Sequence, residues 1–191
     1  ILNSQTYQLS SVSQDSDPRA AANFAAYPLR RLEAEVLIDA LCQLTGSSEK
    51  YTSAIPEPFT FVPDQQRSIA LMDGSISSAF LELFGRPPRD TGLEAERNNR
   101  PTAAQRLHLL NSSHIQRKIE QSRVVQNLAQ SKSPPREMIS GLYLATLSRF
   151  PTEDEARLAS APFEARGASR REAATDLVWA LVNSPEFCCR H

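Results

Sequence analysis

Apolar residues recur at three- and four-residue steps over much of the chain, and this period predicts helices. The pattern is clearest between residues 28 and 45, where seven apolar positions share one face: Leu29, Leu32, Val36, Leu37, Ala40, Leu41 and Leu44. Pro28 suits the first helical position and Gly46 the residue just past the end, so a helix is predicted over this whole range. Arg31 and Glu35 are expected to pair on its surface.

Helix starts are marked repeatedly in the second half of the chain. Four Ser or Thr residues stand three positions before Gln or Glu, which is the spacing of a capping box: Thr102 with Gln105, Ser113 with Gln116, Thr152 with Glu155, and Ser169 with Glu172. Ser133 before Pro134 marks a fifth start. Apolar stripes follow these starts, and five helices joined by short turns predict a bundle-like core.

Two stretches lack this helical period. Residues 1–27 form an irregular arm in which Thr6–Leu9 alternates briefly like an edge strand. Residues 47–100 are interrupted by prolines, so Phe59–Val62 is expected to be a short strand or an extended segment. A short helix over Ile76–Phe84, stopped by Gly85, is expected within that segment.

These elements predict a mainly α fold with bundle-like packing of about six to seven helices. The arm at residues 1–27 would precede a single helical domain over residues 28–191, which contains the Pro-rich irregular connection at 47–100. The two extended stretches leave room for one short two-stranded β element.

Composition narrows the class of protein. Hydrophobic residues make up 40% of the 191 positions and charged residues 23%, which is typical of a globular domain. The net charge is −1 with both signs interspersed, so no nucleic-acid partner is expected. No apolar run is long enough to predict a membrane span. Because Ile1 stands where an initiator Met would be, we expect the chain to be part of a longer protein.

The cysteines and histidines predict no metal site. An odd cysteine count and the adjacent Cys188 and Cys189 favour buried thiols, although one of these could pair with Cys42. His108 and His114 are six positions apart, which would place them on different sides of one helix. Zinc needs three or four converging ligands, so we expect no metal and no other cofactor in this chain.

One stretch, residues 86–111, concentrates polar chemistry. Its candidate residues are Arg86, Arg89, Glu94, Glu96, Arg97, Arg100, His108 and Asn111. Carboxylates flanked by arginines can serve acid–base chemistry or hold a sugar or an anionic group. The alternative is an ion-pair network that fixes an irregular connection against the helices. The chain contains no known catalytic motif, so no catalytic residue is predicted.

Five segments, in order and over nearly the whole chain, resemble a planctomycete domain of unknown function: Pro28–Leu41, Leu83–Arg89, Glu96–Asn111, Leu142–Thr152 and Asp176–Phe187. The resemblance implies the C-terminal domain of a large exported protein and therefore an extracytoplasmic location. It also implies upstream domains, often cytochrome-c-like, so that any haem would lie there. The family supplies no activity to carry over. Relatives often have cysteines just before the Glu96–Arg97 pair, where this chain has Leu93 and Ala95.

Two functions are consistent with these observations. The first is an interaction or scaffold module that packs against the upstream domains of the same polypeptide. The second is part of an extracytoplasmic enzyme acting on polysaccharide or a related polymer, with residues 86–111 contributing to the site and Glu96 and Arg97 as its working residues. A carbohydrate or another exported protein would then be a further partner.

Overall fold

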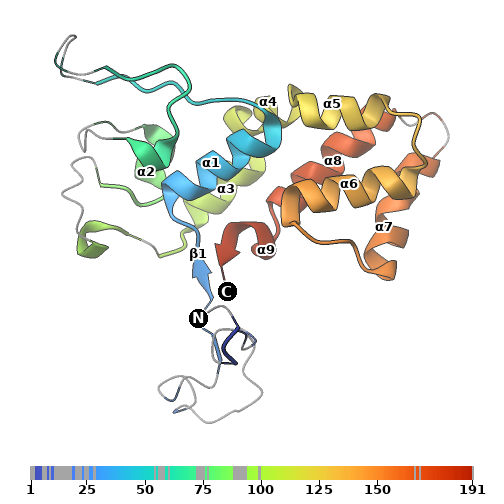
Figure 1. Cartoon of the computed structure of the whole chain (residues 1–191), viewed down its shortest axis with the longest axis horizontal. Coiled ribbons are helices and arrows are strands. Elements are labelled where there is room, and N and C mark those ends of the chain that lie inside the picture. Colours follow the sequence, from blue (N-terminus) through green and yellow to red (C-terminus); the bar gives the residue numbers. More distant parts are fainter. Residues whose placement is uncertain are drawn as a thin grey trace.

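The computed structural model describes residues 29–53, 61–71, 78–87, 94–98, 100–165 and 169–190, together with residues 3–5, 8, 10, 19, 23, 26, 27, 55, 59, 76 and 167. Within these residues the protein is mainly helical and has one short two-stranded antiparallel sheet, which confirms the predicted fold class. Helices α6, α7 and α8 lie at one end of the molecule and α2 near the other, with α1, α3 and α4 between them (Figure 1).

The described part of the chain forms the following helices and strands, given in chain order. They are β1 (Arg30–Arg31), α1 (Ala34–Thr45), the 3₁₀ helix η1 (Ser68–Ala70), α2 (Ala79–Leu83), the 3₁₀ helix η2 (Glu94–Glu96), α3 (Ala103–Asn111), α4 (Ser113–Glu120), α5 (Arg123–Gln130), α6 (Pro135–Leu147), α7 (Glu153–Glu164), α8 (Arg170–Val182), α9 (Pro185–Cys188) and β2 (Cys189–Arg190).

Helix α8 lies at the centre of the packing and contacts α4, α5, α6 and α7. Ala174, Val178 and Val182, spaced four residues apart, are fully buried on the side of the main core, which also includes the apolar face of α1. On another side, Leu181 joins a smaller cluster with Ile139 and Tyr143 of α6. Because α8 is shared by both clusters, its apolar residues connect the smaller cluster to the main core.

Most of the predicted helix starts are correct. Thr102 with Gln105 and Thr152 with Glu155 form complete capping boxes, and Ser169 accepts the backbone N–H of Glu172. The predicted cap at Ser113 is wrong by one residue, because the hydroxyl of Ser112 accepts the N–H of Ile115. Likewise α6 begins at Pro135 rather than directly after Ser133.

The first helix begins later than predicted. Arg30 and Arg31 lie in β1, and α1 starts only at Ala34. Arg31 is kept extended by tertiary contacts: its backbone pairs with Cys189, and its guanidinium donates a 2.7 Å hydrogen bond to the carbonyl oxygen of Phe84. The expected Arg31–Glu35 pair is therefore also wrong. The predicted end is confirmed, since Gly46 adopts the left-handed conformation (φ 65°) that closes the helix.

The small sheet joins the two ends of the described domain. β1 and β2 are antiparallel, with Arg30 opposite Arg190 and Arg31 opposite Cys189. Of the two stretches that suggested strands, Phe61 and Val62 belong to no strand, and Thr6, Tyr7 and Leu9 lie outside the described residues. Pairing between residues so distant in the chain leaves no local pattern, so the sequence indicated a β element but not its position.

The short helix predicted over Ile76–Phe84 is present as the five-residue α2. It starts at Ala79 because the hydroxyl of Ser78 accepts the backbone N–H of Leu81. It ends at Leu83, one residue before the predicted end, and Gly85 follows with a positive φ of 102° that turns the chain away from the helix. The N–H of Asn98 then donates to the carbonyl oxygen of Gly85 at 3.0 Å, which ties the Pro-rich connection back to α2.

Candidate functional site

The polar residues predicted between 86 and 111 occupy several different environments. Arg97 donates two hydrogen bonds to the carboxylate of Glu35, at 2.8 and 2.9 Å. The Nε atom of Arg86 lies 3.5 Å from the same carboxylate, and Arg86 and Glu35 are only 4% and 3% exposed. Glu35 was not among the predicted site residues, yet it is where two of them meet.

The remaining candidates lie elsewhere. Glu96, Arg100 and Asn111 are exposed, whereas Arg89 and the side chain of Glu94 lie outside the described residues. Gln105, which was not a candidate, is buried and donates to the carbonyl oxygen of Leu83 at 2.8 Å. Among the described candidates, then, the two arginines on Glu35 hold the connection before α3 against α1.

His108 and His114 are brought together, contrary to the expectation that they face different sides of a helix. The chain turns at Ser112 between α3 and α4, and the two imidazole rings lie edge to face with centroids 6.1 Å apart. Both rings also contact Phe80 of α2. Burial lowers the pKa of His108, and the neighbouring His114 lowers it further, so His108 favours the neutral form.

The other face of His114 reaches the segment that follows α1. His114 Nε2 lies 2.8 Å from an oxygen of Glu49, and the ammonium of Lys118 lies 2.7 Å from the same oxygen. Burial raises the pKa of Glu49, but hydrogen bonds from His114 and Lys118 outweigh that effect and the net shift is downward. The carboxylate of Glu49 is therefore already paired with side chains of α4, Lys118 and His114.

Lys118 of α4 holds the Gly46–Glu49 turn in place through several polar contacts. Besides Glu49, its ammonium donates to the hydroxyl of Ser47 at 3.0 Å and to the carbonyl oxygen of Ser48 at 3.4 Å. It also lies 3.4 Å from the sulfur of Cys42 on α1. One half-buried cation thus connects α4, the turn and α1, so the shape of this turn is determined by the fold.

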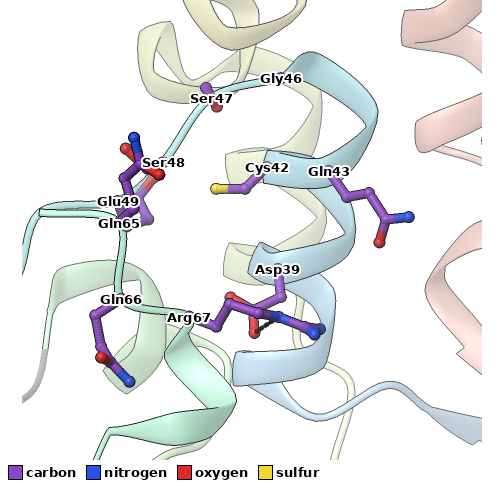
Figure 2. Close-up of a pocket in the computed structure, with 10 residues that line it drawn as sticks. All are labelled: Asp39, Cys42, Gln43, Gly46, Ser47, Ser48, Glu49, Gln65, Gln66 and Arg67. Atoms are coloured by element: carbon purple, nitrogen blue, oxygen red, sulfur yellow. Dashed lines mark ion pairs between the residues drawn. The ribbon is translucent and has the colours of Figure 1, made fainter. Parts of the chain in front are cut away.

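An open pocket of about 370 Å³ lies on one side of the turn, between α1 and the segment leading into η1. Figure 2 shows the side chains of Asp39 and Cys42 of α1 on the side that faces the turn and residues 65–67, whereas Gln43, at the edge of the pocket, points away from them. The carboxylate of Asp39 is already engaged within the fold, since it accepts hydrogen bonds from the backbone N–H groups of Ser68 and Ile69. Burial raises the pKa of the Cys42 thiol, and the Lys118 ammonium offsets this only in part.

A second open pocket, of about 570 Å³, lies on the other side of the same turn. One wall is the turn and the other is the polar face of α4 and the start of α5: Ser113, His114, Arg117, Lys118, Gln121 and Arg123. The opposite face of α4 is buried through Ile115 and Ile119. We refer to the residues lining the two pockets as the turn face.

The turn face was not predicted from the sequence. A usable signal was present in α4, where apolar Ile115 and Ile119 alternate with polar positions at helical spacing. That pattern shows which face of the helix is polar. It does not show that residues 46–49, far away in the sequence, lie across from it.

The described part of the chain shows neither a metal-binding cluster nor a membrane-spanning helix. Among the residues that the structure describes, no three His, Cys, Asp or Glu side chains gather closely enough to hold a metal ion. The three cysteines are free thiols. Within the same residues, no helix has both the length and the apolar character required to cross a membrane.

The fold and the site define a mainly helical domain with a polar face lined by two pockets. The chain belongs to the family described as PSD1, protein of unknown function (DUF1553), whose match spans residues 1–162. This confirms the resemblance to a domain of unknown function. The match ends within α7, before α8, the helix shared by both apolar clusters. No curated protein and no solved structure matches the chain.

Proposed function

We propose that this domain is an interaction module whose partner binds at the turn face. The observation that carries this proposal is that an exposed polar turn is held in one shape by Lys118 and His114 through Glu49. A binding surface that is ordered in advance loses less conformational entropy when its partner arrives. Two open pockets beside one fixed turn also offer a concave surface for side chains of the partner.

The partner we propose is an acidic stretch of the neighbouring polypeptide in the same parent protein. The turn face is polar, and Arg117 and Arg123 bring positive charge to its rim, whereas Arg67 is paired with Asp39 at 3.5 Å. A polar, charged surface favours a contact between domains that can separate, rather than an obligate apolar one. The resemblance to C-terminal domains of large exported proteins supports a partner within the same chain.

The same resemblance supports an extracytoplasmic setting for the parent protein. Fusing alkaline phosphatase to the C-terminus of the parent would test this, because that enzyme becomes active only where its disulfides form. An inactive fusion that is nevertheless produced at full length would argue for the cytoplasm.

The alternative, an enzyme site for polysaccharide at residues 86–111, has less support. It requires Glu96 and Arg97 to face a ligand. The guanidinium of Arg97 is engaged by Glu35 and its side chain is only 16% exposed. A residue committed to a buried carboxylate is a weak candidate for binding substrate.

Site-specific photo-cross-linking in the full-length parent protein would test the interaction module. A benzophenone amino acid would replace Gln43, which lines the first pocket, and Gln121, which lines the second. Leu158 on α7 is the control position, because it is 72% exposed and lines neither pocket. Cross-linked peptides would be identified by mass spectrometry.

We expect the two turn-face positions to cross-link to residues of the same polypeptide outside this domain, and the Leu158 position not to do so. Cross-links from Leu158 alone, or from no position, would overturn the proposal. Cross-links that reach only a second protein would show that the proposed partner is wrong. The proposed partner would also be wrong if a soluble oligosaccharide abolished the cross-links.

A further inference from the structure

We propose that the pocket along α4 binds an oxyanion, meaning a carboxylate, sulfate or phosphate group. This inference deepens the interaction proposed for the turn face and rests on it. The pocket has two walls, the Gly46–Glu49 turn and the polar face of α4. The positions on α4 follow helical spacing, so their side chains project toward the same space.

Two cations of this pocket have no partner among the residues that the structure describes. Arg117 on α4 and Arg123 at the start of α5 both line it and are exposed. Neither has an ion pair or a side-chain hydrogen bond to any residue that the structure describes. Arg106 is also exposed and unpaired in the described part of the chain, but it does not line this pocket.

Glu49, the one carboxylate among the described residues that line the pocket, does not cancel these charges. Glu49 is matched at close range by Lys118 and His114, which keep it in contact with α4. The positive potential of Arg117 and Arg123 therefore remains available to a ligand. Guanidinium groups bind planar and tetrahedral oxyanions through forked, charge-assisted hydrogen bonds.

Neutral donors complete the pocket. Ser113 and Gln121 line it at the two ends of α4, and the described part of the chain provides neither side chain with a hydrogen-bond partner. Ser113 is also the first residue of α4, where the helix dipole favours negative charge. Within the described part of the chain, the pocket thus combines donors and guanidinium groups that have no partner with a carboxylate that is already paired. This combination suits an anion better than a cation.

Nuclear magnetic resonance titration of the 191-residue chain would test the inference. The probes are sodium phosphate, sodium sulfate and an N-acetylated triglutamate peptide amide, with an N-acetylated triglutamine peptide amide as the neutral control. The readouts are the side-chain Nε–H signals of Arg117 and Arg123 and the backbone amide of Ser113. Each titration would be repeated with the variant Arg117→Gln/Arg123→Gln and with the matched control Arg106→Gln.

We expect at least one anion to shift these signals saturably, with a Kd in the millimolar range that rises with ionic strength. The double variant should weaken that binding by about tenfold or more, whereas Arg106→Gln should leave it unchanged. A preference for triglutamate would indicate a protein carboxylate, and a preference for phosphate or sulfate a ligand carrying that group.

The absence of saturable shifts with every anion would overturn the inference, as would equal binding by the double variant. If the photo-cross-links from Gln121 persisted in that case, the interaction module would stand without the oxyanion. If anions bound as expected but no position cross-linked, the pocket would be an anion site and the proposed polypeptide partner would fail.

Discussion

Arg97 and Glu35, 62 positions apart in the chain, form two parallel hydrogen bonds of 2.8 and 2.9 Å. This forked pair joins the connection before α3 to the first turn of α1. Glu35 is 3% exposed and also lies near Arg86, so its negative charge is shared by two arginines inside the fold. The pair explains how Arg97, which follows η2, is held against α1.

Removing Arg97 should therefore destabilise the domain. The Arg97→Ala variant leaves a buried carboxylate without its forked partner, and we expect the free energy of unfolding to fall by about 3 kcal/mol. Denaturant unfolding followed by circular dichroism would measure it. Arg100→Ala is the control, because Arg100 is exposed, and its effect should stay within about 0.5 kcal/mol. Equal stability of the two variants would mean that Glu35 is satisfied without Arg97.

Gly85 and Gly46 should tolerate alanine very differently. Both have positive φ, 102° and 65°, but a Cβ on Gly85 would lie 2.1 Å from the carbonyl oxygen of Asn98, whereas one on Gly46 meets nothing within 4 Å. Gly46→Ala should cost about 1–2 kcal/mol from backbone strain alone. Gly85→Ala should cost about 3 kcal/mol or more, because backbone must also move. Thermal unfolding of the two variants would compare them, and similar losses would contradict the predicted clash.

His108 should make the domain less stable in mild acid. Burial and His114 lower the pKa of His108 in the folded state, so the unfolded chain takes up the proton first, from its ordinary value of 6.5 downward. Above that value the residue is neutral in both states and contributes no pH dependence. We expect lower stability at about pH 5.5 than at about pH 7.5, and less of this dependence in His108→Gln.

Urea unfolding at the two pH values would measure the effect. Glu49 does not obscure it: the lowered pKa of Glu49 contributes stability above its ordinary value of 4.5, and this is lost only in stronger acid. The same difference between the two pH values in His108→Gln and in the unaltered chain would assign the effect to another group.

A chain that ends at residue 162, where the family match ends, should not fold cooperatively. It lacks α8, whose Ala174, Val178 and Val182 are fully buried, and each valine contributes roughly 1.5–3 kcal/mol through burial. The shortened chain would also lose β2, the partner strand of β1. Circular dichroism during heating would show a broad, gradual change instead of one transition. A sharp transition in the shortened chain would show that α1–α7 fold without α8.

Several elements were predictable because their signals are local. The end of α1 at Gly46 and the starts of α3 and α7 at Thr102 and Thr152 depend on residues within one helical turn. The start of α1 was predicted wrongly for the opposite reason. Arg31 is held extended by its contacts with Cys189 and Phe84, and the residues next to Arg31 in the sequence do not predict such long-range contacts.

The candidate site was likewise predictable only in part. Sequence alone identified polar side chains at 86–111, but only the tertiary structure showed that Arg86 and Arg97 meet at Glu35 while Glu96 and Arg100 are exposed. It likewise brought His108 close to His114, because the turn at Ser112 changes the direction of the helix between them.

The sequence by itself determined the helical class, several helix limits and the apolar faces, since backbone groups at helix ends and side chains at helical spacing are satisfied by near neighbours. The tertiary structure decided the partners of the buried charges, the pairing of β1 with β2 and the turn face between α1 and α4. Those features depend on which surfaces come into contact when the helices pack. Many different residue patterns would be compatible with each of these contacts. Their positions become definite only when the buried charges and backbone groups of the whole fold are satisfied together.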